Sequence, residues 1–397
     1  MIIKMADLSV NIGGLCLKNP IIVASGPLTS KFHRIKKAAD CGVAAVSLKH
    51  SMLKHPFHAK PRWYHEKGMG LIVSGDPRLD VGEAVDLICK TKAETDLRIM
   101  VNMSASPVDV NTWGELAAQF EKAGADAIEI NMNCPNLNSA EAKGAALGAS
   151  LGQDPDSVAA VVSNVKSSVK IPVIAKLPSE GGRMHQVAVR AEEAGADILN
   201  IHAAFRSAPG LDIYNNGAMM YPGTDKGPFG GYTGPWSRLT SNRFIADIAR
   251  ICKTPVMGGG GITQWEHIVE SIMYGAWCVQ ICAAFMLEGF ELCEKLLKSL
   301  EEYMDGIGYK SVADFNGLAL NNIITPDKME YSDIVAQIDQ QSCSGCKKCT
   351  RFGHCEAVEF NPETKKCAVD ANVCEACGFC LPVCPTASIS MVSRQNL

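Results

Sequence analysis

The sequence has no apolar run long enough to span a membrane: a transmembrane helix needs about 18 consecutive apolar residues, and no stretch approaches that length. It also lacks an excess of basic residues, since the formal net charge is −4 and the pI is near 6.2. This balance argues against nucleic acid or an anionic membrane surface as a partner. Residues 1–14, MIIKMADLSVNIGG, show no apolar core followed by a small-residue cleavage site. We therefore expect a cytoplasmic protein.

Two further absences narrow the function. No G-x-G-x-x-G motif follows a predicted strand, so the chain shows no nicotinamide or FAD domain of its own. No low-complexity tract is present either. The chain does contain 17 cysteines among 397 residues. In a long cytoplasmic chain such numbers indicate metal ligation or catalysis rather than disulfides.

The region from about residue 20 to 290 alternates short apolar runs with amphipathic segments of helical length, as successive parallel βα units do. Most of the candidate strands are apolar nearly throughout, which is expected of strands covered on both faces. This pattern predicts an α/β fold, a (β/α)8 TIM barrel over residues 1–308, with its chemistry at the carboxyl ends of the strands. A doubly wound open sheet is the alternative. The eight candidate strands lie at residues 21–26, 44–49, 98–104, 127–133, 172–177, 198–203, 255–261 and 278–284.

The C-terminal region carries a dense cysteine pattern. We expect a connecting segment over residues 309–334 and a ferredoxin-like domain over residues 335–397. The second cysteine set reads C-x2-C-x2-C-x3-C-P, a spacing at which three thiolates bind one [4Fe–4S] cluster and the fourth reaches another. The first set has five residues before its last cysteine, yet we also expect a cluster there; a pair of zinc sites is the alternative. The eight expected ligands are Cys343, Cys346, Cys349, Cys355, Cys374, Cys377, Cys380 and Cys384.

A glycine run follows the seventh candidate strand and opens a helix. Backbone N–H groups at such a turn can bind a phosphate, and barrel phosphate sites commonly use the loops after strands seven and eight. A tight turn without a ligand is the alternative. The candidate phosphate site comprises Gly259, Gly260 and Gly261 together with the backbone of Cys282, Ala283 and Ala284.

Several of these segments resemble the dihydroorotate dehydrogenase-like flavoproteins, and within them the FMN and iron–sulfur subunits of bacterial NAD-dependent dihydropyrimidine dehydrogenases. The matching motifs are NPIIVASGPLT (19–29), LKH (48–50), NMNCPN (131–136), LGQDP (151–155), IAKL (174–177), GGYTGP (230–235) and the cysteine-rich tail. The resemblance implies FMN as the cofactor. Besides the glycine run, it places around the FMN Ala24, Ser25, Gly26, Lys49, Asn102, Lys176, Thr233 and Gly234.

The two lysines each end a candidate strand. A buried lysine beside a flavin would stabilise the negative charge that develops on the reduced ring. A solvated strand-end cation is the alternative for both Lys49 and Lys176.

The resemblance also gives Cys134 a role. In the family, the cysteine of N-x-x-C-P lies on a mobile loop and exchanges a proton with a substrate carbon, while flavin N5 exchanges a hydride with the neighbouring carbon. A thiol with a pKa near 8.5 can hold and lose a proton. The alternative is a buried, inert cysteine. Asn131 and Asn133 are then expected to contact the substrate.

One departure from the family concerns the substrate. Pyrimidine-handling members carry an Asn-Thr pair after the sixth strand, whereas this chain has Ala203 and Ala204 there. Neither alanine can bond a ring amide. We hypothesise that uracil and thymine are not substrates and that the substrate carries a carboxylate or another acceptor that Arg206 binds, with His202 close by as a further substrate-binding residue. A true dihydropyrimidine or dihydroorotate dehydrogenase that reads its ring differently is the alternative. Arg206 as a solvated rim charge is left open.

The partners follow from electron transfer. A flavin exchanges two electrons and each cluster passes one, so the tail would connect FMN to an outside donor. The resemblance implies an FAD- and NAD(P)H-dependent reductase subunit or a ferredoxin as that donor, and a homodimer or higher oligomer. Two other function classes stay open: a non-catalytic electron-transfer subunit, and a barrel lyase or isomerase without metal.

Overall fold

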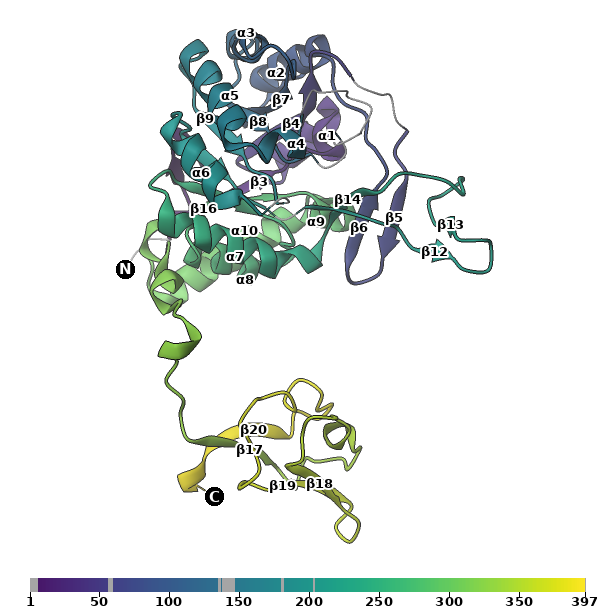
Figure 1. Ribbon diagram of the computed structural model, residues 1–397. Coiled ribbons are helices and arrows are strands. Elements are labelled where there is room, and N and C mark those ends of the chain that lie inside the picture. Colours follow the sequence, from purple (N-terminus) through teal and green to yellow (C-terminus); the bar gives the residue numbers. More distant parts are fainter. Residues whose placement is uncertain are drawn as a thin grey trace. The chain divides into compact units, whose positions relative to one another are not determined.

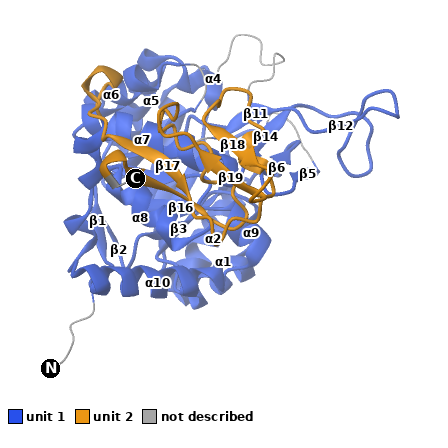
Figure 2. Ribbon diagram, turned by 90° about the horizontal axis from the view of Figure 1, so that it is seen from below, with its two compact units in different colours: residues 1–323 blue, residues 324–397 orange. Residues whose placement is uncertain are grey.

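The computed structural model describes residues 6–55, 60–134, 137, 147–179, 182–202 and 204–396. The chain divides into two compact units, residues 1–323 and 324–397, which Figure 2 shows in blue and orange. The boundaries predicted from the sequence, 1–308, 309–334 and 335–397, stay a prediction.

The first unit is built on a closed parallel barrel (Figure 1). The predicted TIM barrel is confirmed, and the open-sheet alternative is wrong. Each barrel strand coincides with one of the apolar runs that the sequence singles out. In chain order the strands are β3 (Ile21–Val23), β4 (Ala45–Met52), β7 (Arg98–Ser104), β8 (Ala127–Asn131), β9 (Val173–Lys176), β10 (Ile198–Asn200), β15 (Val256–Gly259) and β16 (Ala276–Ile281).

Helices follow the barrel strands and cover them. Side-chain caps set several of their starts: Asp80 and Glu83 form a capping box at α2, and the Asp154 carboxylate accepts the Ser157 N–H at 3.1 Å at the start of α5. Their apolar faces bury the strands almost completely. The helices are α1 (Phe32–Asp40), α2 (Val81–Glu94), α3 (Asn111–Lys122), α4 (Ala149–Gly152), α5 (Pro155–Ser168), α6 (Met184–Glu193), α7 (Arg238–Ile251), α8 (Trp265–Met273), α9 (Ala283–Glu288) and α10 (Leu292–Ile307).

A short hairpin, β1 (Val10–Ile12) and β2 (Leu15–Leu17), closes the amino-terminal end of the barrel. Its turn lies against the starts of the strands: a Cβ added to Gly13, whose φ is +53°, would lie 2.4 Å from the Asp197 carbonyl oxygen. Arg98, the first residue of β7, donates to the Cys16 carbonyl at 3.2 Å. The carboxyl ends of the strands are therefore the end at which a ligand can enter.

A second sheet stands at the carboxyl-terminal side and is not predicted from the sequence. It joins the segment after β4 to the segment after β10 in the antiparallel order β11-β14-β6-β5. The two segments approach closely, because a Cβ on Gly70 would lie 2.1 Å from the Thr233 carbonyl oxygen. The strands are β5 (Trp63–Glu66), β6 (Gly70–Val73), β11 (Phe205–Ser207) and β14 (Gly230–Thr233), and β12 (Leu211–Asp212) pairs with β13 (Ala218–Met219) within the second segment.

The second unit contains two antiparallel strand pairs and short 3₁₀ turns. β17 (Ile334–Ile338) pairs with β20 (Ile389–Ser393), and β18 (Val358–Asn361) pairs with β19 (Lys366–Val369). Between them run the loops that carry the cysteines. Within the described residues, no helix combines the length and the apolar character needed to cross a membrane.

Candidate active site

A cavity of about 270 Å³ opens at the carboxyl-terminal side of the barrel. This volume lies close to the lower end of the range of about 300–1,000 Å³ that is typical of small-molecule sites. Its wall comes from the carboxyl-terminal ends of barrel strands, β4 among them, from the segments that follow these strands, and from β5, β6 and β14 of the second sheet. The predicted residues that line it are Ala24, Ser25, Gly26, Lys49, Lys176, His202, Thr233, Gly234, Gly260, Gly261, Cys282, Ala283 and Ala284.

Three glycines of the cavity wall, Gly26, Gly234 and Gly261, have no room for a side chain. A Cβ on Gly26 would lie 2.7 Å from the Cys282 sulfur, and one on Gly261, whose φ is +73°, would lie 2.6 Å from the Arg238 nitrogen. The wall is thus bare backbone at these points, which suits a phosphate or a flat ring. Gly259 lies in β15 behind this wall and does not line the cavity.

Both predicted lysines are buried, so the alternative of solvated strand-end cations is wrong. Lys49 is 8% exposed and Lys176 is 5% exposed. Lys49 lies in β4 and pairs with Asp76, with 2.6 Å between Nζ and Oδ2. Lys176 ends β9 and lies 3.2 Å from Oε1 of Glu129. A buried cation is stable only when it is paired, and each lysine has its own carboxylate.

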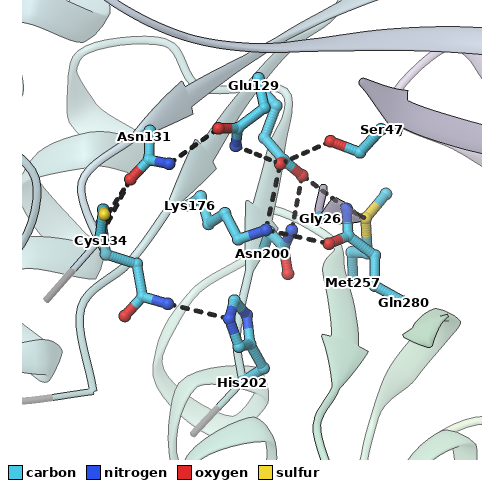
Figure 3. A network of polar contacts seen from close by, with 12 residues as sticks. Gly26, Ser47, Glu129, Asn131, Cys134, Lys176, Asn200, His202, Met257 and Gln280 are labelled. Carbon is cyan, nitrogen blue, oxygen red and sulfur yellow. Dashed lines mark hydrogen bonds and ion pairs between the residues drawn. The ribbon is translucent and has the colours of Figure 1, made fainter. Parts of the chain in front are cut away.

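Glu129 is the centre of a polar network inside the barrel (Figure 3). It is the middle residue of β8 and is fully buried. Its two carboxylate oxygens accept hydrogen bonds from residues of five other barrel strands. The donors are Ser47 at 2.8 Å, Asn102 at 2.5 Å, Lys176 at 3.2 Å, Asn200 at 2.7 Å and Gln280 at 2.5 Å.

The environment of Glu129 keeps its carboxyl group ionised. Burial by itself would raise the pKa of this group, but the charge of Lys176 and the hydrogen bonds from Gln280, Asn102 and Ser47 outweigh it and hold the pKa below its ordinary value. A fixed carboxylate accepts hydrogen bonds and cannot donate them. It therefore dictates the orientation of the amides that bond to it.

The network extends from Glu129 to Cys134. Asn102 donates to Glu129, and its oxygen accepts the Asn131 amide at 2.7 Å. The Asn131 oxygen in turn accepts the backbone N–H groups of Asn133 at 3.2 Å and Cys134 at 2.9 Å. Asn131 thus holds the segment that carries the half-buried Cys134, and Figure 3 shows Asn131 between Glu129 and Cys134.

The thiol of Cys134 lies near a buried cation. Nη2 of Arg78, a residue that is 9% exposed, is 3.8 Å from the Cys134 sulfur. Arg78 belongs to the segment between β6 and α2, which also carries Asp76.

The remaining predicted substrate residues lie in different places. Asn133 and His202 bond to each other at 2.9 Å at the cavity side of the network. Arg206 lies in β11, does not line the cavity, and places its guanidinium 5.9 Å from the centre of the Phe229 ring.

Of the two alanines after the sixth barrel strand, Ala204 is buried and its N–H donates to the Ser179 hydroxyl at 2.9 Å. Ala203 and residues 138–146 of the predicted mobile loop lie outside the described residues.

The sequence comparison agrees with this architecture. The profile of the dihydroorotate dehydrogenase family matches residues 7–304. The chain belongs to the dihydroorotate dehydrogenase family. The matched residues span the barrel and the cavity at its carboxyl-terminal side, and the predicted family is confirmed.

Individual relatives in this family cover different shares of the chain. The NAD-dependent dihydropyrimidine dehydrogenase subunit PreA of Escherichia coli strain K12 is 28% identical over 97% of this chain and 95% of its own length. The catalytic subunit of dihydroorotate dehydrogenase B (NAD(+)) is 33% identical in Pyrococcus abyssi and 30% identical in Thermococcus kodakarensis, over 79% and 80% of this chain and 99% of each relative. These names describe dehydrogenases of CH–CH bonds, which confirms the predicted enzyme class.

Cysteines of the second unit line two cavities, and each cavity contains cysteines from both sets. One, of about 290 Å³, is lined by Cys355, Cys374, Cys377 and Cys380. The other, of about 20 Å³, is lined by Cys343, Cys346, Cys349 and Cys384 and also by Cys367. Among the residues that the structure describes, no three His, Cys, Asp or Glu side chains are grouped as ligands of a single metal ion.

Sequence reasoning missed several residues of this dihydroorotate dehydrogenase-family site. Glu129 and Gln280 lie in strands that are otherwise apolar, AIEIN and AWCVQI. A charged or amide side chain in a strand buried on both faces is itself a signal, because such a group needs partners inside the barrel. Asp76 and Arg78 follow β6, which the sequence does not predict, so no comparable signal marks them.

Proposed function

We propose that this chain is an FMN-dependent oxidoreductase that acts on a C=C or CH–CH bond of a small, polar or cyclic substrate. The observation that carries the proposal is the convergence of Cys134 and Lys176 on one buried carboxylate. Lys176 bonds to Glu129 at the cavity wall, and the hydrogen bonds that start at Glu129 end at the backbone N–H of Cys134. One hydrogen-bonded network thus positions both Lys176, the proposed cation beside the cofactor, and Cys134, the proposed proton donor to the substrate.

The cavity residues fit an FMN. The bare backbone at Gly260 and Gly261 and after β16 suits the phosphate, and Lys176 and Lys49 suit the electron-rich end of the ring. When bound, FMN supplies or accepts the hydride. Cys134 gives a proton to the neighbouring carbon or takes one from it, and the Arg78 guanidinium lies beside its sulfur.

The lining of the two cysteine-rich cavities supports the proposal that this chain binds two [4Fe–4S] clusters. In a two-cluster ferredoxin, the fourth cysteine of each run ligates the other cluster, and each cavity contains three cysteines of one run and the last cysteine of the other. We assign the ligands accordingly; a cluster that binds in the smaller cavity must widen it. Cys367, 1% exposed, stays a core residue in this assignment.

The clusters connect the barrel to an outside electron partner. An FAD- and NAD(P)H-dependent reductase subunit fits this role, because the E. coli relative is itself named as a subunit of an NAD-dependent enzyme. A ferredoxin is the alternative donor. We further propose a cytoplasmic homodimer or higher oligomer with a small-molecule substrate.

Two alternatives are part of the proposal. The enzyme is a dihydropyrimidine or dihydroorotate dehydrogenase proper if uracil, thymine or dihydroorotate is turned over fastest. It is a non-catalytic electron-transfer subunit if the loaded protein passes electrons but converts no substrate. The alanines after β10 favour an acceptor-bearing substrate such as an unsaturated carboxylic acid over uracil or thymine.

The test measures turnover by anaerobically purified protein that contains its full complement of FMN and iron–sulfur clusters. The substrates are uracil, thymine, dihydroorotate and unsaturated carboxylic acids. Cys134→Ala should reduce turnover by about 10²–10⁴-fold, the usual contribution of a general acid or base, while reduction of the flavin by the electron donor continues. Cys16→Ala, at an exposed cysteine of β2, is the matched control. A Cys134→Ala protein with undiminished turnover, or iron-loaded protein without a yellow flavin, contradicts the proposal.

A further inference from the structure

His202 presents one ring nitrogen with a partner and one without. Its Nε2 lies 2.9 Å from the Asn133 side-chain nitrogen. Its Nδ1 is buried and, among the described residues, has no hydrogen-bond partner. The side chain lines the cavity proposed to bind FMN and substrate. The tautomer of this ring therefore decides what the cavity offers to a ligand.

A backbone group fixes the orientation of Asn133. The N–H of Ser179 lies 3.2 Å from Oδ1 of Asn133. A backbone N–H can only donate, so the atom it meets is the carbonyl oxygen of the amide. The amide nitrogen of Asn133 consequently faces His202 and donates to Nε2. An Nε2 that accepts carries no proton, and the neutral ring must carry its proton on Nδ1.

The ring stays neutral over the physiological range. Burial, and next the positive charge of Lys176, lower the pKa of His202 to about 3, and Glu129 opposes them only in part. His202 is thus a neutral imidazole with a single tautomer. An N–H group that is buried without an acceptor destabilises the protein. A ligand oxygen placed at Nδ1 would recover this free energy.

We propose that His202 is a specificity-determining residue whose Nδ1–H donates a hydrogen bond to a carbonyl or carboxylate oxygen of the substrate. This inference rests on the proposed function and specifies its substrate class. Asn133, which orients the imidazole, directly precedes Cys134, which exchanges the proton. The short segment after β8 therefore places the thiol and, through Asn133, the N–H donor relative to each other.

The donor also has a role in the chemistry. Reduction of the conjugated C=C bond adds a hydride from reduced FMN to one carbon and a proton from the Cys134 thiol to its neighbour. The thiolate then takes a proton from solvent. Between the two additions, the electron pair of the broken π bond resides largely on the conjugated oxygen. An N–H donor at that oxygen stabilises the charge, as donors in an oxyanion hole do.

This arrangement selects an acceptor oxygen and disfavours a ring N–H at the same point. An N–H group of a substrate that faces the Nδ1–H would leave both donors unsatisfied. The buried methyl group of Ala204 adds no acceptor to correct the mismatch. The substrate class is accordingly α,β-unsaturated carboxylic acids or conjugated ketones and esters.

The test compares three variants of the loaded enzyme with an α,β-unsaturated carboxylic acid as the probe. His202→Gln, which removes the donor at Nδ1, should lower kcat/KM by about 10²-fold, as removal of one oxyanion donor does. His202→Asn, whose amide nitrogen can occupy the Nδ1 position, should recover part of this loss. Asn133→Asp should move the imidazole proton to Nε2 and lower kcat/KM like His202→Gln. His185→Gln, at a half-exposed histidine of α6, is the matched control.

Two further measurements are independent of turnover. In protein with ¹⁵N-labelled histidine, the His202 ring, identified by its absence in His202→Gln, should show a protonated Nδ1 and an unprotonated Nε2. The reverse tautomer in wild-type protein overturns the proposal. A saturated carboxylic acid analogue, followed by its perturbation of the flavin absorbance, should bind more weakly to His202→Gln than to wild type.

The outcomes separate this inference from the proposed function. Weakened FMN affinity in His202→Gln with unchanged analogue binding assigns the imidazole to the cofactor and overturns the proposal. Unchanged kcat/KM and analogue binding overturn it as well. Absence of turnover by wild-type enzyme with every probe contradicts the proposed function instead, and the tautomer and analogue measurements still decide the role of His202.

Discussion

The barrel and the C-terminal unit differ in what stabilises their interiors. The barrel encloses a large, continuous apolar core, and its buried charges are paired by the protein itself, as Glu129 and Lys176 are. The core of the C-terminal unit is small, and half of its buried members are cysteines: Ala336, Ile338, Cys343, Cys349, Val358, Cys367, Cys380 and Ile389.

The two units are therefore stabilised in different ways. Three of the four buried core cysteines of the C-terminal unit are ligands in the proposed cluster assignment, so most of the thiols in its core would bind iron. Small units bury too little apolar surface to be stable on that basis alone. The barrel, by contrast, obtains its order from its own apolar core and from charges that it pairs internally.

The largest expected effect is therefore the loss of iron. Removal of iron by a chelator after oxidation should unfold residues 324–397 and leave the barrel folded. Structural zinc contributes apparent free energies of about 10–16 kcal/mol in small zinc fingers, and binding there is coupled to folding in the same way. Hydrogen exchange followed by mass spectrometry measures both units in one sample. Equal protection of residues 324–397 with and without iron would show that this unit needs no cluster.

The second largest effect is expected from breaking the buried ion pair between Glu129 and Lys176 in the barrel. Glu129→Ala leaves Lys176 buried without its carboxylate, and breaking a buried ion pair in this way destabilises proteins by about 3–5 kcal/mol. Urea unfolding of the barrel transition provides the measurement. Glu115→Ala, at an exposed position of α3, is the control and should stay within about 0.5 kcal/mol of wild type. A similar small change for Glu129→Ala would mean that the network does not stabilise the barrel.

Acid provides a milder perturbation of the same group. The pKa of Glu129 in the folded protein is held below its ordinary value, which is about 4.3. Its contribution to stability is therefore fully present above that value and is lost as the pH falls through the lower, folded-state pKa. The expected slope is at most about 1.4 kcal/mol per pH unit for this one group. Unfolding curves of wild type and Glu129→Gln between neutral pH and pH 3 should converge as the pH falls; parallel curves would contradict the assignment.

The smallest expected effect is that of a single helix cap. Asp154→Ala removes the side chain that accepts the Ser157 N–H at the start of α5, and loss of such a cap costs about 1 kcal/mol. The thermal midpoint of the barrel transition measures it. Asp154→Asn, which retains an acceptor oxygen, should restore most of the loss. A large effect of Asp154→Ala would show that the barrel depends on local contacts more than its core suggests.

The sequence predicts the barrel well, because each of its strands is a local apolar run with a helix between it and the next. It does not predict the sheet of β5, β6, β11 and β14, because that sheet pairs residues 63–73 with residues 205–233 and no local pattern records such a pairing. The same limit applies to the site. Lys49 and Lys176 stand out at strand ends, whereas Asp76 and Arg78 are brought to the barrel by the unpredicted sheet.

Orientation is the other property that a sequence pattern does not contain. Asn131 is expected to meet the substrate, yet its oxygen accepts two backbone N–H groups of its own segment. Arg206 is four positions from His202, but β11 directs the chain away from the cavity and its guanidinium lies over Phe229. These outcomes depend on side-chain geometry across several strands, which is established only when the barrel closes.

The sheet that joins the segments after β4 and β10 has a practical consequence for redesign. β14 pairs with β6 through backbone hydrogen bonds, with glycines such as Gly70 at the contact. The segment after β4 and the segment after β10 therefore form one structural unit. Transplanting either segment alone from a relative would leave an unpaired strand edge beside the cavity entrance. A chimaera with altered substrate preference must exchange both together.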